Sequence, residues 1–97
     1  MNRLELKEKF EKANINPYSY SFEDNYLQEC YCMLKTDIGW EVFYRERGEK
    51  SKVRWFELER DACEYLDYLV FTDEVYSAGG MATSWDDFKK TGRYTLR

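Results

Sequence analysis

An alternating run of apolar and polar residues in the middle of the chain places the strongest constraint on the fold. Over residues 40–47, Trp40, Val42 and Tyr44 fall on one side, and most of the residues between them are charged. A period of two is typical of a half-buried strand. The turn-forming run Gly48–Ser51 follows at once. The sequence therefore predicts that this strand enters a β-hairpin.

Two more strands are predicted on either side of this one. Residues 26–36 carry apolar groups at both alternating sets of positions, which predicts a central strand. Residues 52–56 form the third strand, with Val53 and Trp55 expected to point inward and Arg54 outward. Strands joined by short turns predict an antiparallel meander.

A short amphipathic helix is predicted before the strands, over residues 3–13. Leu6 and Phe10 lie on one face of it. Asn2 and Glu5 have the spacing of a capping box, which predicts the start of the helix. The proline at position 17 lies beyond its end, and a loop leading into a strand follows over residues 17–25.

The main helix is predicted over residues 58–71. Its apolar positions share one face: Leu58, Ala62, Tyr65, Leu66 and Leu69. Further on, a short helix capped by Thr83 or Ser84 and a small strand over residues 94–96 are expected. The whole predicts one α+β domain over residues 1–97, a three- or four-stranded antiparallel sheet with two main helices packed on one face.

Charge and composition narrow the functional classes. The net charge of −4 and the pI of about 4.9 disfavour nucleic acid and anionic membranes as partners. No apolar run reaches membrane length, and the charged start of the chain is unlike a signal peptide, so a cytoplasmic location is expected. The high aromatic content, 19%, favours a protein partner instead.

The residue types argue against an enzyme. The chain has no histidine, which is the commonest general acid/base and metal ligand. It also has no P-loop, dinucleotide glycine fingerprint or zinc-ligand spacing. The sequence therefore predicts no catalytic residues, no metal and no cofactor. A small ligand site among the aromatic residues around Trp40, Trp55 and Trp85 stays open as a further possibility.

Two other features have a simple structural interpretation. Cys30 and Cys32 would place both sulfurs on one face of a strand, which could begin a metal site, but only Cys63 is left to complete it. We interpret all three as small buried hydrophobes. The charge-rich segment 45–54, with a net charge of +3, is interpreted as a solvated hairpin that blunts edge pairing rather than a phosphate-binding patch.

An acidic stripe on the main helix is the best binding candidate. Residues 57–74 hold seven acidic groups and one basic group. An aromatic group among carboxylates suits docking against a basic protein surface, whereas the alternative is an ordinary solvated helix face with Phe71 buried under the tail. The predicted partner-binding residues are Glu57, Asp61, Glu64, Asp67, Tyr68 and Phe71.

A set of residues spread over about half the chain resembles a pattern of small bacterial immunity proteins. These proteins accompany the toxins of polymorphic and contact-dependent growth inhibition systems. The matching residues are Tyr18-Ser19 to Phe22, Glu29-Cys30, the run Trp40-Glu41-Val42-Phe43-Tyr44-Arg45-Glu46-Arg47-Gly48, then Phe56, Glu59, Ala62-Cys63 and Tyr65-Leu66.

The resemblance implies a cytoplasmic protein that binds a cognate toxin and occludes its active site. The acidic character of the main helix suits a toxin with a basic surface, such as a nuclease. A non-catalytic regulatory module that binds a protein or peptide through its sheet edge is the alternative. The sequence leaves the toxin's identity and the oligomeric state open.

Overall fold

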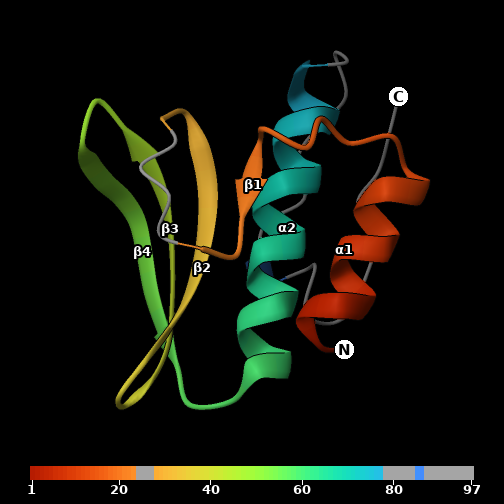
Figure 1. Ribbon diagram of the computed structural model, residues 1–97. Coiled ribbons are helices and arrows are strands. Elements are labelled where there is room, and N and C mark those ends of the chain that lie inside the picture. Colours follow the sequence, from red (N-terminus) through yellow and green to blue (C-terminus); the bar gives the residue numbers. More distant parts are fainter. Residues whose placement is uncertain (24–27, 78–84, 87–97) are drawn as a thin grey trace.

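The fold is α+β, as predicted, with a four-stranded mixed sheet and two helices on one face of it (Figure 1). This computed structural model describes residues 1–23, 28–77 and 85–86. The strand order is β1-β2-β3-β4; β1 runs parallel to β2, and the other pairs are antiparallel. The elements are α1 (Arg3–Lys12), β1 (Tyr20–Ser21), β2 (Cys30–Thr36), β3 (Gly39–Glu46), β4 (Glu49–Phe56) and α2 (Glu59–Ser77).

Helices α1 and α2 lie side by side and run in the same direction (Figure 1). The predicted capping box starts α1: the Asn2 side chain accepts from the Glu5 amide at 2.9 Å, and the Asn2 amide donates to the Glu5 carboxylate at 3.1 Å. The two amides are among the donors that a helix start leaves unsatisfied, so this exchange stabilises the first turn. Asn14, at φ 56°, ends the helix in the left-handed region.

The main core fills the layer between the helices and the sheet. Phe10 of α1 lies at its centre, with ring centroids 4.7 Å from Tyr20 of β1 and 5.7 Å from Phe71 of α2. One aromatic side chain therefore joins three elements. The other fully buried members include Leu6, Met33, Val42, Cys63 and Leu66.

Strand β1 was not expected from the sequence, which predicts a loop here. It is only two residues long, and it pairs Tyr20 with Tyr31 and Ser21 with Cys32. The Tyr31 amide also donates to the Ser19 carbonyl at 2.9 Å. Two residues cannot display a period of two, so the sequence pattern gives no signal for such a strand. The sheet is mixed for this reason rather than wholly antiparallel.

Strand β2 begins later than predicted, because the predicted range 26–36 includes residues 28 and 29 and the strand does not. Gln28 and Glu29 precede the strand, and Glu29 adopts φ 54°, which interrupts the extended backbone. Within β2 the predicted two-sided burial is confirmed. Tyr31 and Met33 belong to the main core, while Cys30 and its neighbours at even positions face the other side.

The predicted orientation of β4 is wrong. Val42 pairs with Arg54 and Tyr44 pairs with Ser51, so β4 carries one residue more than β3 between these pairs. This is a β-bulge, and Lys52 adopts φ 55° within it. Because of the extra residue, the side chains of β4 after the bulge point to the faces opposite to those predicted. Trp55 therefore lies on the face away from the helices, 55% exposed, and Val53 is exposed too.

Helix α2 begins at Glu59 and continues beyond the predicted end, to Ser77. The Thr72 hydroxyl donates to the Tyr68 carbonyl at 2.7 Å, so this residue is accommodated within the helix. Of the predicted short helix after it, only Trp85 and Asp86 are described, and both are helical. Its predicted caps at 83–84 and the predicted strand over 94–96 lie outside the described residues.

Candidate interaction surface

Only part of the acidic stripe is exposed at the surface of the folded protein. Glu64 is exposed and Asp61, three residues before it on α2, is half-buried. Glu57 is exposed too, and it lies in the bend before α2. By contrast, Asp67 is only 3% exposed and Phe71 is buried. The prediction that all of these residues share an exposed face is therefore wrong for Asp67 and Phe71.

Asp67 is buried against α1. Its Oδ2 accepts from Lys9 Nζ at 2.6 Å, and its Oδ1 has no hydrogen-bond partner among the described residues. Burial raises the pKa of the Asp67 carboxyl, and the hydrogen bond and charge of Lys9 act in the opposite direction. This carboxylate holds the two helices together rather than facing a partner.

The two aromatic candidates also contact the protein itself. The Phe71 ring packs on Phe10, and Lys9 Nζ lies 5.0 Å from its centroid. Tyr68 is half-buried, with its ring 6.2 Å from Tyr65 and 5.3 Å from Trp85. Neither ring is an exposed anchor. The signal in the sequence was the amphipathic helix α1, which carries Lys9. A helical wheel of α2 alone does not show that α1 covers Asp67 and Phe71.

Exposed apolar side chains gather instead where both helices start. Met1 and Leu4 at the beginning of α1 are exposed, and Leu58 at the beginning of α2 is 47% exposed. Leu4 lines one shallow hollow, and Met1 and Leu58 line another. Asn2 and Glu59 line both hollows. We call this region the helix-end surface, defined by Met1, Leu4, Glu57, Leu58 and Asp61.

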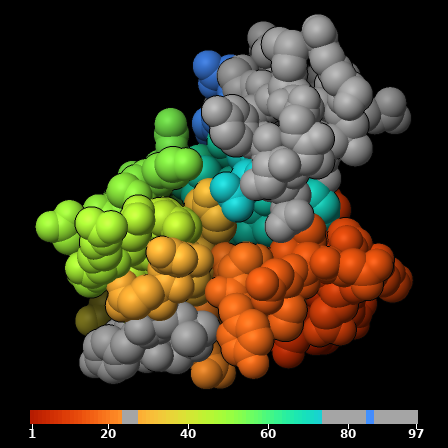
Figure 2. Space-filling model, turned by 90° about the horizontal axis from the view of Figure 1, so that it is seen from above, coloured from red at the N-terminus to blue at the C-terminus, as the bar shows by residue number. Residues whose placement is uncertain are grey.

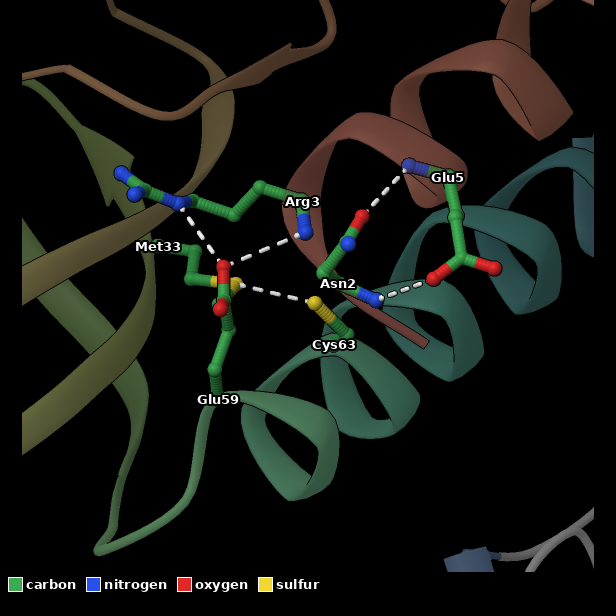
Figure 3. Close-up of polar contacts among 6 residues, drawn as sticks. All are labelled: Asn2, Arg3, Glu5, Met33, Glu59 and Cys63. Carbon is green, nitrogen blue, oxygen red and sulfur yellow. Dashed lines mark hydrogen bonds and ion pairs between the residues drawn. The ribbon is translucent and has the colours of Figure 1, made fainter.

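Polar contacts among the first residues of the two helices hold this surface in place (Figure 3). The backbone amide and Nε of Arg3 both donate to Glu59 Oε2, at 3.2 and 2.9 Å. Beneath them, the Cys63 thiol donates to the Met33 sulfur at 3.9 Å. Glu59 therefore has a structural role. Glu57 is exposed, and the half-buried Asp61 has its Oδ1 atom 3.9 Å from Arg60 Nε.

The β2–β3 turn lies at the same end of the molecule (Figure 1). Gly39, at φ 148°, approaches the backbone of β4 so closely that a Cβ atom there would lie 2.4 Å from the Phe56 oxygen. This contact brings the turn beside the segment that leads into α2. Ile38, at the tip of the turn, is 82% exposed and adds a further apolar group to this end.

The basic hairpin lies at the opposite end of the molecule. Figure 2 looks onto that end and shows the residues around the β3–β4 turn projecting at one side. Among them, Lys50 Nζ pairs with Glu41 at 3.0 Å and lies 4.5 Å from the Phe43 ring centroid. The β3–β4 turn and the helix-end surface thus lie at opposite ends of the described residues.

The face of the sheet away from the helices has a small core of its own. Cys30, Cys32 and Phe43 are buried there, with Leu34 packed against them. Cys63 is buried on the helix side, so the prediction that the three cysteines are buried is confirmed. Since Trp40 lies in the main core and Trp55 on the opposite face, the tryptophans do not line one common pocket.

Comparison with protein-family models, with curated proteins and with solved structures gave no match. No group of three or more potential metal-ligating side chains occurs among residues 1–23, 28–77 and 85–86. Over the same residues, neither helix has the length and apolar character that crossing a lipid bilayer requires. The candidate interaction surface therefore rests on the geometry of the helix ends.

Proposed function

We propose that this chain is an immunity protein that binds a cognate bacterial toxin in the cytoplasm and occludes its active site stoichiometrically. The observation that carries the proposal is the helix-end surface, in which exposed apolar side chains lie among charged groups: Glu5, Glu59 and Arg60 line the hollow that Leu58 borders. The resemblance of the 40–66 region to immunity proteins is consistent with it. The expected target is a nuclease or another toxin domain that acts in the cytosol.

Leu58 is the natural anchor of such an interface. It lies between Glu57 and Asp61, and its carbonyl accepts from the Ala62 amide at 3.2 Å, which fixes its backbone at the start of α2. An apolar centre with a charged rim is the usual anatomy of a protein interface. Because capping and the Arg3–Glu59 pair already order this end, binding loses little conformational entropy.

The carboxylates indicate the charge of the partner. Asp61 and Glu64 lie three residues apart on α2, Glu57 lies in the bend just before it, and the chain as a whole is acidic. A toxin that cuts nucleic acid needs a basic active site, because its substrate is a polyanion. Charge complementarity would speed the encounter and select such a partner. The proposed mechanism is thus non-catalytic and requires no cofactor.

The proposal is tested by co-expressing the chain with the protein encoded immediately upstream. A one-to-one complex that silences a toxic activity is the expected result. In that complex, the double variant Glu57→Lys/Asp61→Lys should weaken binding by at least ~10-fold, since it places cations against a basic surface. The dissociation constant is measured by calorimetry.

A matched control is available at the basic end. Glu46 and Glu49 are exposed and pair across the β3–β4 turn, so Glu46→Lys/Glu49→Lys changes the net charge equally. This control should leave affinity nearly unchanged. Equal weakening by both double variants, or no weakening by the first, would exclude the helix-end surface.

A second candidate function is a regulatory module that binds its partner through the sheet edge. The observation in its favour is β4, the last strand of the described sheet, on which Val53 and Trp55 are exposed. Under this function, Trp55→Ala would abolish binding while Glu57→Lys/Asp61→Lys would not. The same calorimetric experiment therefore separates the two candidates.

A further inference from the structure

The face of the sheet away from the helices brings two thiols together. Cys30 and Cys32 are alternate residues of β2, and their Sγ atoms lie 3.6 Å apart. Both side chains are buried. Arg45 of β3 lies opposite Cys30 in the strand register. A dithiol thus lies beside a fixed positive charge in a largely water-excluded cluster.

The thiols on the two faces of the sheet have pKa values shifted in opposite directions. The hydrogen bond from Cys32 lowers the pKa of the Cys30 thiol, Arg45 acts in the same direction, and burial opposes both. On the helix face, burial raises the pKa of Cys63 to about 12, with a further contribution from Glu59. The sulfur beside Cys63 is the Met33 thioether, which cannot form a disulfide.

The cover over the dithiol cluster includes long side chains. Both helices pack on the other face of the sheet (Figure 1). Across Phe43 lie the Lys50 ammonium, 4.5 Å from the ring centroid, and the Arg45 guanidinium, 5.3 Å from it. Of these two side chains, Lys50 is exposed and changes rotamer on a short timescale, which admits a small uncharged reagent. Their positive charges disfavour a metal cation.

We propose that Cys30 and Cys32 are a redox-sensitive pair, in which a hydroperoxide oxidises Cys30 and Cys32 closes a disulfide with it. The Cys30 thiolate attacks a peroxide oxygen, the O–O bond breaks, and the released hydroxide takes the proton of the Cys32 thiol. The Cys32 thiolate then attacks the sulfenic sulfur of Cys30 and expels hydroxide, which a solvent proton converts to water. The two sulfurs lose two electrons, and hydrogen peroxide is reduced to two waters.

Oxidation would alter β2 mechanically. Residues two apart in a strand are separated by about 6.7 Å, close to the upper limit of about 6.8 Å for bridged Cα atoms. The disulfide therefore contracts the strand around Tyr31. The Tyr31 amide is bonded to Ser19, and Tyr31 pairs with Tyr20, so the contraction loosens β1. The thermal midpoint of the oxidised protein should fall as a result.

The test treats the reduced, folded full chain with hydrogen peroxide. The expected product is lighter by the mass of two hydrogen atoms, and after denaturation only Cys63 reacts with maleimide. Peptide mapping should place the disulfide between Cys30 and Cys32. Cys63→Ser is the matched control and should form the same disulfide at the same rate.

A second variant captures the intermediate. In Cys32→Ser, the Cys30 sulfenic acid cannot be resolved and should be trapped by dimedone, at least ~10-fold faster than any adduct at Cys63. Oxidation of Cys63 as fast as Cys30, or three thiols that stay alkylatable in the wild type after peroxide, would overturn the proposal. The wild-type experiment decides the matter even if the variant does not fold.

Discussion

The burial of Asp67 reverses the usual dependence of stability on pH that a carboxylate gives. The pKa of the Asp67 carboxyl in the folded state is raised above the ordinary value of an aspartate, chiefly by burial and in spite of Lys9. The folded state therefore holds its proton more tightly than the unfolded state does. The stability that this contributes is fully present below the unfolded pKa and is lost as pH rises through the folded pKa.

The variant Asp67→Asn removes this titration while keeping the shape of the side chain. Relative to the variant, the wild type should lose free energy of unfolding as pH rises from about 4 toward 7. Lys9→Met should make the loss steeper, since Lys9 favours the charged form. Urea unfolding across this pH range measures it. A difference between wild type and Asp67→Asn that does not change with pH would contradict the assignment.

Gly39 provides a second prediction at the scale of one residue. Gly39→Ala combines an unfavourable φ with a Cβ atom 2.4 Å from the Phe56 oxygen, so it should cost at least ~1–3 kcal/mol of unfolding free energy. Gly48→Ala is the control, because it shares a positive φ of 78° but has no atom within 4 Å of its added Cβ. Chemical denaturation should find the larger loss at Gly39, and equal losses would refute a steric cause.

The sequence correctly predicts the environment of residues whose contacts or burial depend on neighbours close by in the chain. The Asn2–Glu5 capping box depends on two residues three apart, and the burial of Phe10 depends on the period of one helix. Asp67 and Phe71 were placed wrongly because their environment comes from α1, more than fifty residues earlier. Helical periodicity specifies a side of the helix but not which neighbour covers it.

Among the elements, β4 shows how one extra residue rearranges a surface. The β-bulge at Lys52 turns Trp55 out beside Glu41 and leaves Arg54 over the Tyr65 ring, 5.2 Å from its centroid. The Lys52 carbonyl is also the acceptor for the Tyr65 hydroxyl, at 3.1 Å. A strand pattern read from sequence assumes an unbroken period, so it cannot anticipate this exchange of faces.

The orientation of β4 predicts a contrast between two tryptophans. Trp55→Ala should lower the free energy of unfolding by less than ~1 kcal/mol, because the side chain is 55% exposed. Trp40→Ala should cost about 3–5 kcal/mol, because Trp40 is 7% exposed and packs in the main core. Urea denaturation of both variants measures the contrast. A larger loss at Trp55 would show that it faces the core.

At the scale of the whole molecule, the sequence anticipates the α+β class, the three antiparallel strands and both helices. It does not anticipate β1, which is held by the Tyr20–Tyr31 pair and by burial against Phe10 rather than by a pattern of its own. It also misses the helix-end surface. The hollows beside Leu4 and Leu58 are both lined by Asn2 and Glu59, and this arrangement exists only when α1 and α2 lie side by side.

The pairing of α1 with α2 also affects the time at which the protein can complete its fold. The meander and α2 are contiguous in sequence, whereas Lys9 and Asp67 are 58 residues apart. At ribosomal rates of about 5–20 residues per second, α1 waits roughly 3–12 s after its own synthesis for that partner. During this interval Leu6 and Phe10 have no α2 to cover them. Helix α1 is therefore made well before the helix on which it docks, and a nascent chain must protect the apolar face of α1 until then.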